Sequence, residues 1–286
     1  MTGNMRILTF DIEDWFHLLE NDSTRTEDQW RQFVPRIERN TDLILEALSF
    51  KGLRATFFCL GWVAKNHSNV IKRIHAAGHD IGSHSYSHQL ITEQGYDQFR
   101  QDLSRSISVL EELTGSKIRA YRAPGFSMTP KTLWAIDALV ENGIEIDSSV
   151  FVSTRAHGGF AKFRSFEPCL IRREGMVLKE FPLVPGRVAG KTLAFSGGGY
   201  FRLLPYFQTR RMYSRSDYVM SYFHPRDFDA YQPRLPGLPW NRFFKSYVGL
   251  HSSFEKFQTL LDEFSFIDLK TADLLIDWDS QPTVDL

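Results

Sequence analysis

Apolar residues in the first half of the chain alternate between two spacings, one typical of buried strands and one typical of helices. Residues 6–10 and 55–60 are short apolar runs, whereas residues 35–50 and 96–114 repeat apolar side chains at helical spacing. The same alternation predicts strands at 80–83, 120–122 and 144–147 and helices at 69–77 and 130–142. Glycines follow these helices, as expected of helix C-caps. The pattern through about residue 150 predicts an α/β fold of βα units around a parallel sheet.

The second half of the chain is less regular. Residues 151–166 are rich in glycine and basic residues and are expected to form a loop, and the four prolines of residues 225–239 predict irregular structure. Strands are predicted at 177–184 and 218–223 and a helix at 254–264. We find no internal repeat and no low-complexity linker. We therefore expect one barrel domain over residues 1–286, with elaborations and the last barrel strands in residues 151–286.

Polar residues suited to chemistry follow the predicted strands directly. Asp11, His84, Arg122 and Asp147 each stand at or just after the end of a strand in the first half, and His224 follows the strand at 218–223. The carboxyl ends of parallel strands meet at one edge of a sheet, where α/β barrels carry their active sites. We therefore expect these side chains to line one active-site rim.

Two of these motifs together predict a metal site. The segment Asp11-Ile-Glu-Asp14 offers three carboxylates, and His84 and His88 are four residues apart, so that one helical turn would place both imidazoles on one face. Two histidines and one carboxylate leave a coordination position open for water, as in hydrolytic sites. One acid would then bind the ion while another acts as general base. The alternative is that the acids form an N-cap cluster before a helix that follows directly.

Arg122 and His224 complete the predicted site. An arginine at a strand end can pair with the catalytic acid Asp11, orient it and keep it ionised. His224 suits a general acid that protonates a leaving amine, and a third metal ligand is the alternative role. If His224 is the general acid, Asp147 or Asp227 would set the tautomer and the pKa of its imidazole.

The remaining candidates are weaker. The run Gly197–Gly199 lacks the Lys-Ser/Thr of a phosphate loop and is expected to be a backbone turn near the groove, where Arg202 could contact an anionic substrate group. Residues 225–239, with Trp240 and Tyr247, form either a groove wall or a structural wrap across the barrel. The other histidines are expected at the surface or in packing: His17, His67, His75, His79, His157 and His251.

Composition narrows the function classes. The 286 residues carry no net charge and have a pI near 7.1, which argues against nucleic acid and anionic membranes as partners. The two cysteines, Cys59 and Cys169, imply no disulfide framework. Aromatic residues make up 14%, which predicts an aromatic-rich core, with sugar-stacking rings as the alternative. The N-terminus enters a strand without a leader and no apolar run spans a bilayer, so we expect a cytoplasmic protein, or one at the inner face of the membrane.

These motifs, in this order, resemble the polysaccharide deacetylases of carbohydrate esterase family four, which have the nodulation-type deacetylase fold. The matching elements are Thr9-Phe-Asp11, His84-x-x-x-His88, Arg122-x-Pro124, Asp147-Ser-Ser149 and His224. In the second half, Glu180-Phe-Pro182, residues 197–205 and residues 224–234 resemble exopolysaccharide- and exosortase-associated deacetylases, a branch similar to peptidoglycan deacetylases and allantoinase-like proteins. The resemblance implies a distorted (β/α) barrel with about seven parallel strands.

The resemblance also implies ligands and cofactor. Ile12 stands where the common family motif has a second Asp, and relatives in this branch use an acid two positions after the base. That implies Zn²⁺, or Co²⁺ or Ni²⁺, held by Glu13, His84 and His88, with Asp14 as the alternative carboxylate.

The implied reaction is removal of N-acetyl groups from amino sugars of a bacterial polysaccharide or its precursor. Asp11, held by Arg122, would take the proton of the attacking water, and His224 would protonate the sugar amine as acetate leaves. Pro124, Asp147, Tyr200 and Arg202 are expected to shape or contact the substrate. Two alternatives stay open: an allantoinase-like amide or cyclic-amide hydrolase that works without metal, and a glycan-binding protein without activity.

Overall fold

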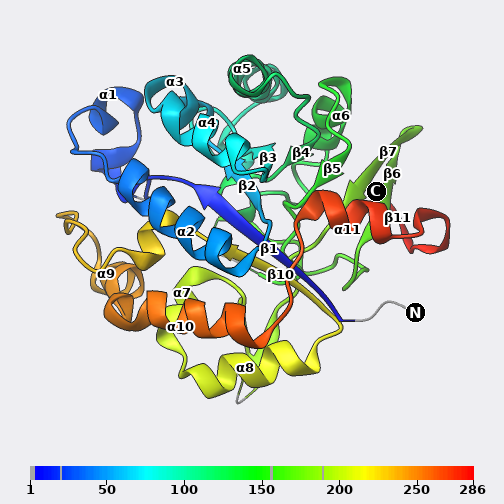
Figure 1. Ribbon diagram of the computed structural model, residues 1–286. Helices are drawn as coiled ribbons and strands as arrows, with labels where there is room; N and C mark the ends of the chain where they lie inside the picture. The colour runs from blue at the N-terminus through cyan, green and yellow to red at the C-terminus, as the bar shows by residue number, and fades with distance from the viewer. Residues whose placement is uncertain (1–3, 20, 155–156, 189) are drawn as a thin grey trace.

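The computed structural model describes residues 4–19, 21–154, 157–188 and 190–286. A nine-stranded sheet runs through its centre (Figure 1). Its strands in chain order are β1 (Met5–Ile12), β2 (Thr56–Cys59), β3 (Asp80–Ser83), β4 (Ala120–Tyr121), β5 (Ile146–Asp147), β6 (Cys169–Arg173), β7 (Met176–Glu180), β10 (Tyr218–Phe223) and β11 (Thr283–Asp285). Two further strands, β8 (Gly186–Val188) and β9 (Lys191–Leu193), form a separate antiparallel pair.

Seven neighbouring strands are parallel. Their spatial order is β10-β1-β2-β3-β4-β5-β7, and β6 and β11 extend the row beyond β7. Strands from both halves of the chain therefore share one sheet, and the predicted α/β fold with about seven parallel strands is confirmed. Because the strands are parallel, their carboxyl ends lie at the same edge.

The two ends of this parallel row approach each other without a strand ladder between β10 and β7 in the described residues. The hydroxyl of Tyr218, at the start of β10, donates a hydrogen bond of 3.0 Å to the carbonyl of Pro182, two residues beyond β7. On its other side, β7 pairs antiparallel with β6. The barrel is therefore distorted, with a seam bridged by side chains.

Helices surround the sheet (Figure 1). They are α1 (Glu27–Trp30), α2 (Ile37–Lys51), α3 (Gly61–Asn66), α4 (Ser68–Ala76), α5 (Tyr96–Thr114), α6 (Trp134–Glu141), α7 (Gly198–Leu203), α8 (Tyr206–Arg215), α9 (Trp240–Tyr247), α10 (Leu250–Glu263) and α11 (Leu269–Leu275). Gly52 and Gly115 end α2 and α5 in the left-handed conformation, at φ 62° and 66°. The predicted glycine C-caps are correct at both helices.

Aromatic residues fill the core between the sheet and α10. Phe10 on β1 stacks on Phe57 of β2 with ring centroids 5.0 Å apart, and Phe257 of α10 meets Phe10 edge-on at 6.0 Å. Phe223 of β10 packs against both Phe10 and Phe257, and all four rings are fully buried. Offset and edge-on ring contacts of this kind add to the energy gained by burial.

The second half departs from the sequence prediction in three places. The strand predicted at 177–184 is shorter, because β7 ends at Glu180, and the hairpin partner β6 was not predicted. The turn expected at Gly197–Gly199 is wrong, because α7 begins at Gly198. The helices α8 and α9 were also missed, and within 225–239 a 3-10 turn spans Pro225–Phe228.

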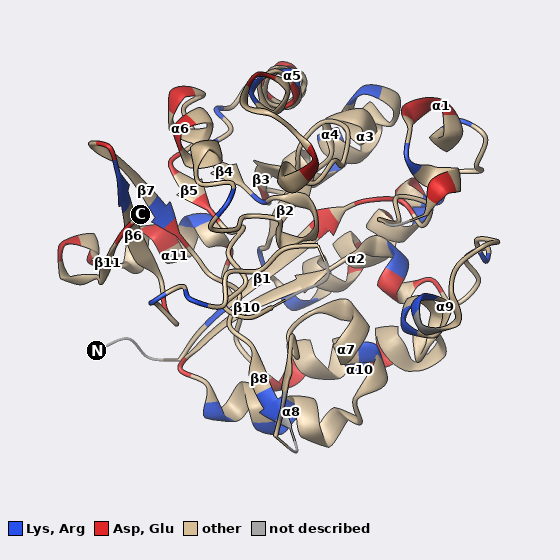
Figure 2. Ribbon diagram, turned by 180° about the vertical axis from the view of Figure 1, so that it is seen from behind, with Lys and Arg blue, Asp and Glu red and all other residues tan. Residues whose placement is uncertain are grey.

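The surface carries no single-sign face in the view of Figure 2, where basic and acidic residues intermingle on the outer helices. This mixture agrees with the zero net charge of the chain. In the part of the chain that the structure describes, no helix combines the length and the hydropathy needed to cross a bilayer.

Candidate active site

The five predicted strand-end residues all lie at the carboxyl edge of the parallel strands. Asp11 is the last residue but one of β1, and Asp147 ends β5. His84, Arg122 and His224 each follow the last residue of β3, β4 and β10. The in-register pairing of these strands brings side chains that are far apart in the sequence to one edge.

Glu13, His84 and His88 form a compact buried cluster. Oε1 of Glu13 lies 3.0 Å from Nε2 of His84 and 2.9 Å from Nε2 of His88, and one ligand atom of each residue falls within 4.8 Å of the others. Burial alone would raise the pKa of Glu13, but the neighbouring His88 and His224 and the close contacts with both cluster histidines hold it well below its usual range. Glu13 is therefore an ionised, buried carboxylate.

The hydrogen bonding of His84 indicates that the cluster fits a cation. Its Nδ1 lies 2.7 Å from the main-chain carbonyl of Arg122, which can only accept, so Nδ1 carries the proton. In the neutral ring, Nε2 then turns a lone pair toward the carboxylate of Glu13 at 3.0 Å. Two acceptors at this distance need a proton or a metal ion between them. A histidine fixed by a carbonyl at one nitrogen is the usual arrangement of a metal ligand.

A loop, and not the expected helical turn, brings His84 and His88 together. Ser85 and His88 have positive φ angles of 70° and 54°, which a helix does not allow. The carboxylate of Asp102 on α5 accepts hydrogen bonds from the main-chain nitrogens of Tyr86 and Ser87 at 2.7 and 3.0 Å. The helical spacing was thus the wrong geometry, and Asp102, which the sequence analysis missed, fixes the loop.

Asp14 lies outside the cluster. Its carboxylate accepts hydrogen bonds from the main-chain nitrogens of Trp15, Arg36 and Ile37, at 2.8, 2.9 and 3.1 Å. Two of these donors belong to the first turn of α2, so Asp14 anchors the amino end of that helix. Burial raises its pKa. Glu13, and not Asp14, faces the two histidines.

Arg122 holds Asp11. The guanidinium is fully buried, and Nη1 donates to Oδ1 of Asp11 at 2.8 Å and to the hydroxyl of Thr9 at 2.7 Å. Nε and Nη2 donate to the carbonyl and hydroxyl of Ser148. The ring of Phe58 lies under the guanidinium, 4.2 Å away. The arginine is therefore fixed on several sides, and it holds the carboxylate of Asp11 in one orientation.

His224 faces the same site from β10. Its Nε2 is 3.8 Å from Oδ2 of Asp11 and 3.8 Å from Oε1 of Glu13. Its Nδ1 lies 3.0 Å from Oδ2 of Asp227, which also accepts the main-chain N–H of His224 at 2.8 Å. Burial disfavours the charged ring, but Glu13, Asp227 and Asp11 outweigh it and raise the pKa of His224 to about 9. Of the two acids considered for this role, Asp227 contacts the imidazole.

Asp147 forms a different pair. It is fully buried and faces Glu180 across β5 and β7, and the two carboxyl groups share a hydrogen bond. Burial raises the pKa of Asp147 to about 6, and burial together with the charge of Asp147 raises that of Glu180 well above its usual range. Ser149 and the main-chain nitrogen of Val150 donate to the pair. Asp147 is thus fully enclosed and does not line the cleft described below.

A cleft of about 450 Å³ opens beside the cluster. Glu13, His224, Tyr200 and Arg202 are among its lining residues, whereas Pro124 lies in a buried 3-10 turn outside the lining. Arg202 is buried, and its Nε donates to Oδ1 of Asp227 at 3.0 Å. Its terminal nitrogens donate to main-chain carbonyls of residues 245, 246 and 248, so that these contacts tie α7 to α9.

Trp240 and Tyr247, which follow the proline-rich segment, lie in different environments. Trp240 is 77% exposed and lies outside the cleft lining. The hydroxyl of Tyr247 accepts from the main-chain nitrogen of Leu235 at 2.8 Å, which fastens the proline-rich segment to α9. Of the two alternatives for residues 225–239, these contacts favour a structural wrap across the barrel over a groove wall.

Two histidines of the lesser group lie close to the site. His17 is buried, and its Nδ1 accepts the main-chain N–H of Asp14 at 3.0 Å, with its ring centroid 6.2 Å from that of His88. Burial and the neighbouring His88 lower its pKa well below the usual value. His157 lines the cleft, with Nε2 3.3 Å from Nη2 of Arg242. The lone position of His157 in an irregular loop gave no signal of this location.

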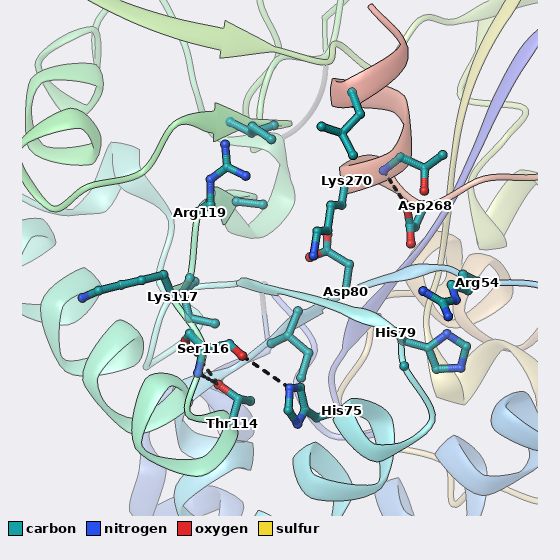
Figure 3. A pocket seen from close by; sticks show the side chains of 17 residues that line it. Arg54, His75, His79, Asp80, Thr114, Ser116, Lys117, Arg119, Asp268 and Lys270 are labelled. Atoms are coloured by element: carbon teal, nitrogen blue, oxygen red, sulfur yellow. Dashed lines mark hydrogen bonds between the residues drawn. The ribbon is translucent and has the colours of Figure 1, made fainter.

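A second cavity, of about 350 Å³, lies at the opposite ends of the strands (Figure 3). Its lining includes Asp80 at the start of β3 and Arg119 just before β4. Arg119 is paired with Glu145 at 2.5 Å, and the figure shows His75 hydrogen-bonded to Ser116. None of the predicted site residues lines this cavity, so it is separate from the candidate active site.

Comparison with known families agrees with this geometry. Residues 4–144, which carry Asp11, Glu13, both cluster histidines and Arg122, match the polysaccharide deacetylase family. The first half of the chain is therefore a polysaccharide deacetylase domain. Residues 148–273, which carry Glu180 and His224, match a domain of unknown function, DUF3473.

Individual relatives cover the chain to different extents. The peptidoglycan-N-acetylglucosamine deacetylase of Bacillus cereus is 29% identical over 120 residues, 38% of this chain and 44% of that protein. The chain thus spans less than half the length of this curated relative.

Solved structures share this fold over nearly the whole length of the chain. The structure of a candidate polysaccharide deacetylase from Mycobacterium smegmatis superposes with a TM-score of 0.65 at 18% identity, over 100% of this chain and 94% of that one. A carbohydrate esterase family 4 pseudoenzyme from Bacillus anthracis superposes with a TM-score of 0.51 at 13% identity, over 94% and 65%. Because a pseudoenzyme shares the fold, the fold alone does not show activity, which depends on the side chains of the site.

Proposed function

We propose that the chain is a metal-dependent hydrolase that removes N-acetyl groups from amino sugars of a bacterial polysaccharide or its precursor and releases acetate. The observation that carries the proposal is the position of two differently charged groups beside the Glu13 cluster. Asp11 is a carboxylate paired with Arg122, and His224 is an imidazole 3.8 Å from both acids. A base and an acid flanking one reacting centre are what amide hydrolysis requires.

Asp11 is the proposed general base. Its Oδ1 is held by Arg122, while its Oδ2 faces His224 and the centre of the site. The fixed ion pair holds Asp11 ionised and oriented, so that Oδ2 can accept a proton from a water molecule. His224 is the proposed general acid, because Asp227 supports its charged form and leaves Nε2 as the proton donor toward the site. This donor would protonate the nitrogen of the departing amino sugar.

Glu13, His84 and His88 would hold the cation, with Zn²⁺ as the proposed ion and Co²⁺ or Ni²⁺ as substitutes. A bound divalent ion supplies Lewis acidity, which polarises a carbonyl and lowers the pKa of water. The contribution of the chain is to fix the donors before binding. The carbonyl of Arg122 orients His84, and the Asp102-anchored loop places His88.

The first experiment joins metal analysis of the purified protein to acetate release from N-acetylglucosamine oligomers, before and after chelation. We expect near-stoichiometric zinc and chelator-sensitive acetate release. His84→Ala should lower the metal content, whereas His75→Ala, on the exposed surface of α4, serves as the matched control and should not. Retention of stoichiometric zinc by the His84 variant would refute this residue as a ligand.

A second experiment tests the base. Asp11→Ala should lower acetate release by roughly 10²- to 10⁴-fold, the usual contribution of acid–base catalysis, while metal content and folding persist. Asp97→Ala, which removes an exposed carboxylate from the first turn of α5, is its control. Unchanged turnover in the Asp11 variant would exclude it as the base.

The same measurements separate the alternatives. A protein without metal that hydrolyses small ureides and ignores chelators would be an allantoinase-like hydrolase. Glycan binding without acetate release, even with zinc, would indicate a binding protein that keeps the fold. The exopolysaccharide setting and a cytoplasmic location stay predictions from the sequence.

A further inference from the structure

Arg226 is a buried cation on the wall of the cleft. It lies in the 3-10 turn Pro225–Phe228, two residues after His224, and is 6% exposed. Its Nε donates to the amide oxygen of Gln232 at 3.1 Å, and Nη2 donates to the carbonyl of Ser246 at 3.3 Å. Both acceptors are neutral. Within the described ranges, Arg226 has no ion pair with a carboxylate, although buried charges in proteins are usually paired.

The nearest carboxylate is already shared by two other cations. Asp227 accepts from Nε of Arg202 at 3.0 Å and lies 3.0 Å from Nδ1 of His224. Burial opposes ionisation of Asp227, but His224 and Arg202 lower its pKa to about 2. For Arg226, burial and the neighbouring Arg202 lower the pKa, which is the direction expected of a buried cation beside a second cation. Asp227 thus pairs with two basic side chains and, among the described residues, leaves Arg226 without a carboxylate partner.

The cleft as a whole carries an excess of positive charge. Four basic residues with permanent charge line it, Arg202, Arg226, Arg242 and Lys245, against two acidic residues, Glu13 and Asp227. The chain has no net charge, so this excess is a local property of the cleft. Any cation held by Glu13 would add to it. A narrow cleft lined by one sign of charge concentrates its field on the bound ligand.

The helix α9 forms the outer part of this cationic wall. It carries Arg242 and Lys245, and its ribbon is partly blue, the colour of basic residues, in Figure 2. The carbonyl of Ser246 accepts from both Arg202 and Arg226, so that the wall is held as a unit next to His224. Lys245 is exposed, and its ammonium group makes no ion pair within the described residues. It is therefore accessible to a ligand that enters the cleft.

We propose that Arg226 and Lys245 bind an anionic group, a carboxylate or a phosphate, carried by the glycan close to the acetamido sugar. This inference rests on the proposed deacetylase function and names its substrate class as acidic glycans. The guanidinium would provide planar donors near His224, and the lysine would provide a mobile charge at the mouth of the cleft. A neutral oligomer would leave the buried charge of Arg226 without a partner.

The test compares three tetrasaccharide substrates by kcat/KM. The first contains only N-acetylglucosamine, the second alternates it with glucuronic acid, and the third carries a phosphate monoester on the neighbouring sugar. We expect the wild-type protein to prefer one of the acidic substrates by about tenfold or more, and the preference to shrink as salt is raised. Preference for the second or the third substrate identifies the anion as carboxylate or phosphate.

Variants then test whether Arg226 and Lys245 cause the preference for acidic substrates. Lys245→Gln should lower the ratio of acidic to neutral kcat/KM severalfold, and Arg226→Gln should lower it further if that variant folds. Lys72→Gln, which removes an exposed lysine from α4 outside the cleft, should leave the ratio as in the wild type. Equal kcat/KM for neutral and acidic substrates in the wild-type protein, or a ratio that Lys245→Gln does not change, would overturn the inference and leave the deacetylase proposal standing.

A binding measurement separates failure of this inference from failure of the proposed function. The glucuronate-containing and neutral oligomers are titrated by calorimetry into the metal-loaded wild-type protein at several salt concentrations. Salt-sensitive binding of the acidic oligomer without release of acetate from any substrate would overturn the deacetylase proposal and support the anionic subsite. Equal binding of both oligomers would refute the subsite.

Discussion

The buried carboxyl pair of Asp147 and Glu180 predicts a decline in stability as the pH rises from acid to neutral. Both side chains are fully buried, and burial raises the pKa of Asp147 from 3.8 to about 6. Between about pH 4 and pH 6 the folded chain therefore keeps a proton that the unfolded chain releases. Asp147 alone makes the free energy of unfolding fall over this window, by about 1.4 kcal/mol per pH unit and about 3 kcal/mol in all. Glu180, whose pKa is also raised, adds a fall in the same direction that extends to higher pH.

Asp147→Asn tests this reasoning, because the amide keeps a hydrogen bond to Glu180 but has no proton to lose. The free energy of unfolding of the variant minus that of the wild type should rise by about 3 kcal/mol between pH 4 and pH 7. Urea unfolding followed by tryptophan fluorescence at several pH values gives this difference. Asp97→Asn, at an exposed carboxylate, should give a difference that does not change with pH. A flat difference for the Asp147 variant as well would refute a retained proton in the pair.

Three further changes probe how the site is held. Gly198→Ala should lower acetate release and cost about 1–3 kcal/mol of stability, because its Cβ would lie only 1.8 Å from Oδ2 of Asp227, while Gly199→Ala, with open space around its Cβ, should do neither. Asp102→Asn should weaken zinc binding by roughly 10- to 100-fold in a chelator competition, because the loop of His88 loses its anchor. Arg122→Lys should destabilise the chain by about 3 kcal/mol in thermal or urea unfolding and lower turnover, because one ammonium cannot satisfy Asp11 and the acceptors of Ser148 together.

The sequence predicts the parallel half of the fold well because each of its elements is locally encoded. Apolar runs mark β1, β2 and β10, and glycines with positive φ end α2 and α5. Once strands and helices alternate, the rule that parallel strands end at one edge places Asp11, His84, Arg122 and His224 there. None of these inferences needs knowledge of long-range side-chain contacts.

The parts that were missed depend on such contacts. The β6–β7 hairpin extends the sheet in the antiparallel sense, which the helix–strand alternation could not indicate. Asp102 lies on the polar face of an amphipathic helix and resembles any solvated acid until the loop of His88 is seen to rest on it. Asp147 follows a strand as the site residues do, but its neighbour in space is Glu180 and not a ligand. Position at a strand end therefore does not by itself place a side chain in the lining of the cleft.

The pairing of charges around the site explains which residues are left to act on ligands. Asp11 forms an ion pair with Arg122, and Asp14 accepts hydrogen bonds from main-chain nitrogens at the amino end of α2. Neither carboxyl group therefore needs a further partner. Glu13 faces only imidazoles, one of which presents a lone pair, so this acid has no arginine or lysine partner in the described residues and a metal ion would balance it. In the cleft, Arg202 and His224 share Asp227, and Arg226 has only neutral acceptors among the described residues. Arg226 is therefore a base whose charge an anion would balance. Both imbalances lie close to His224, and each calls for a ligand of opposite sign.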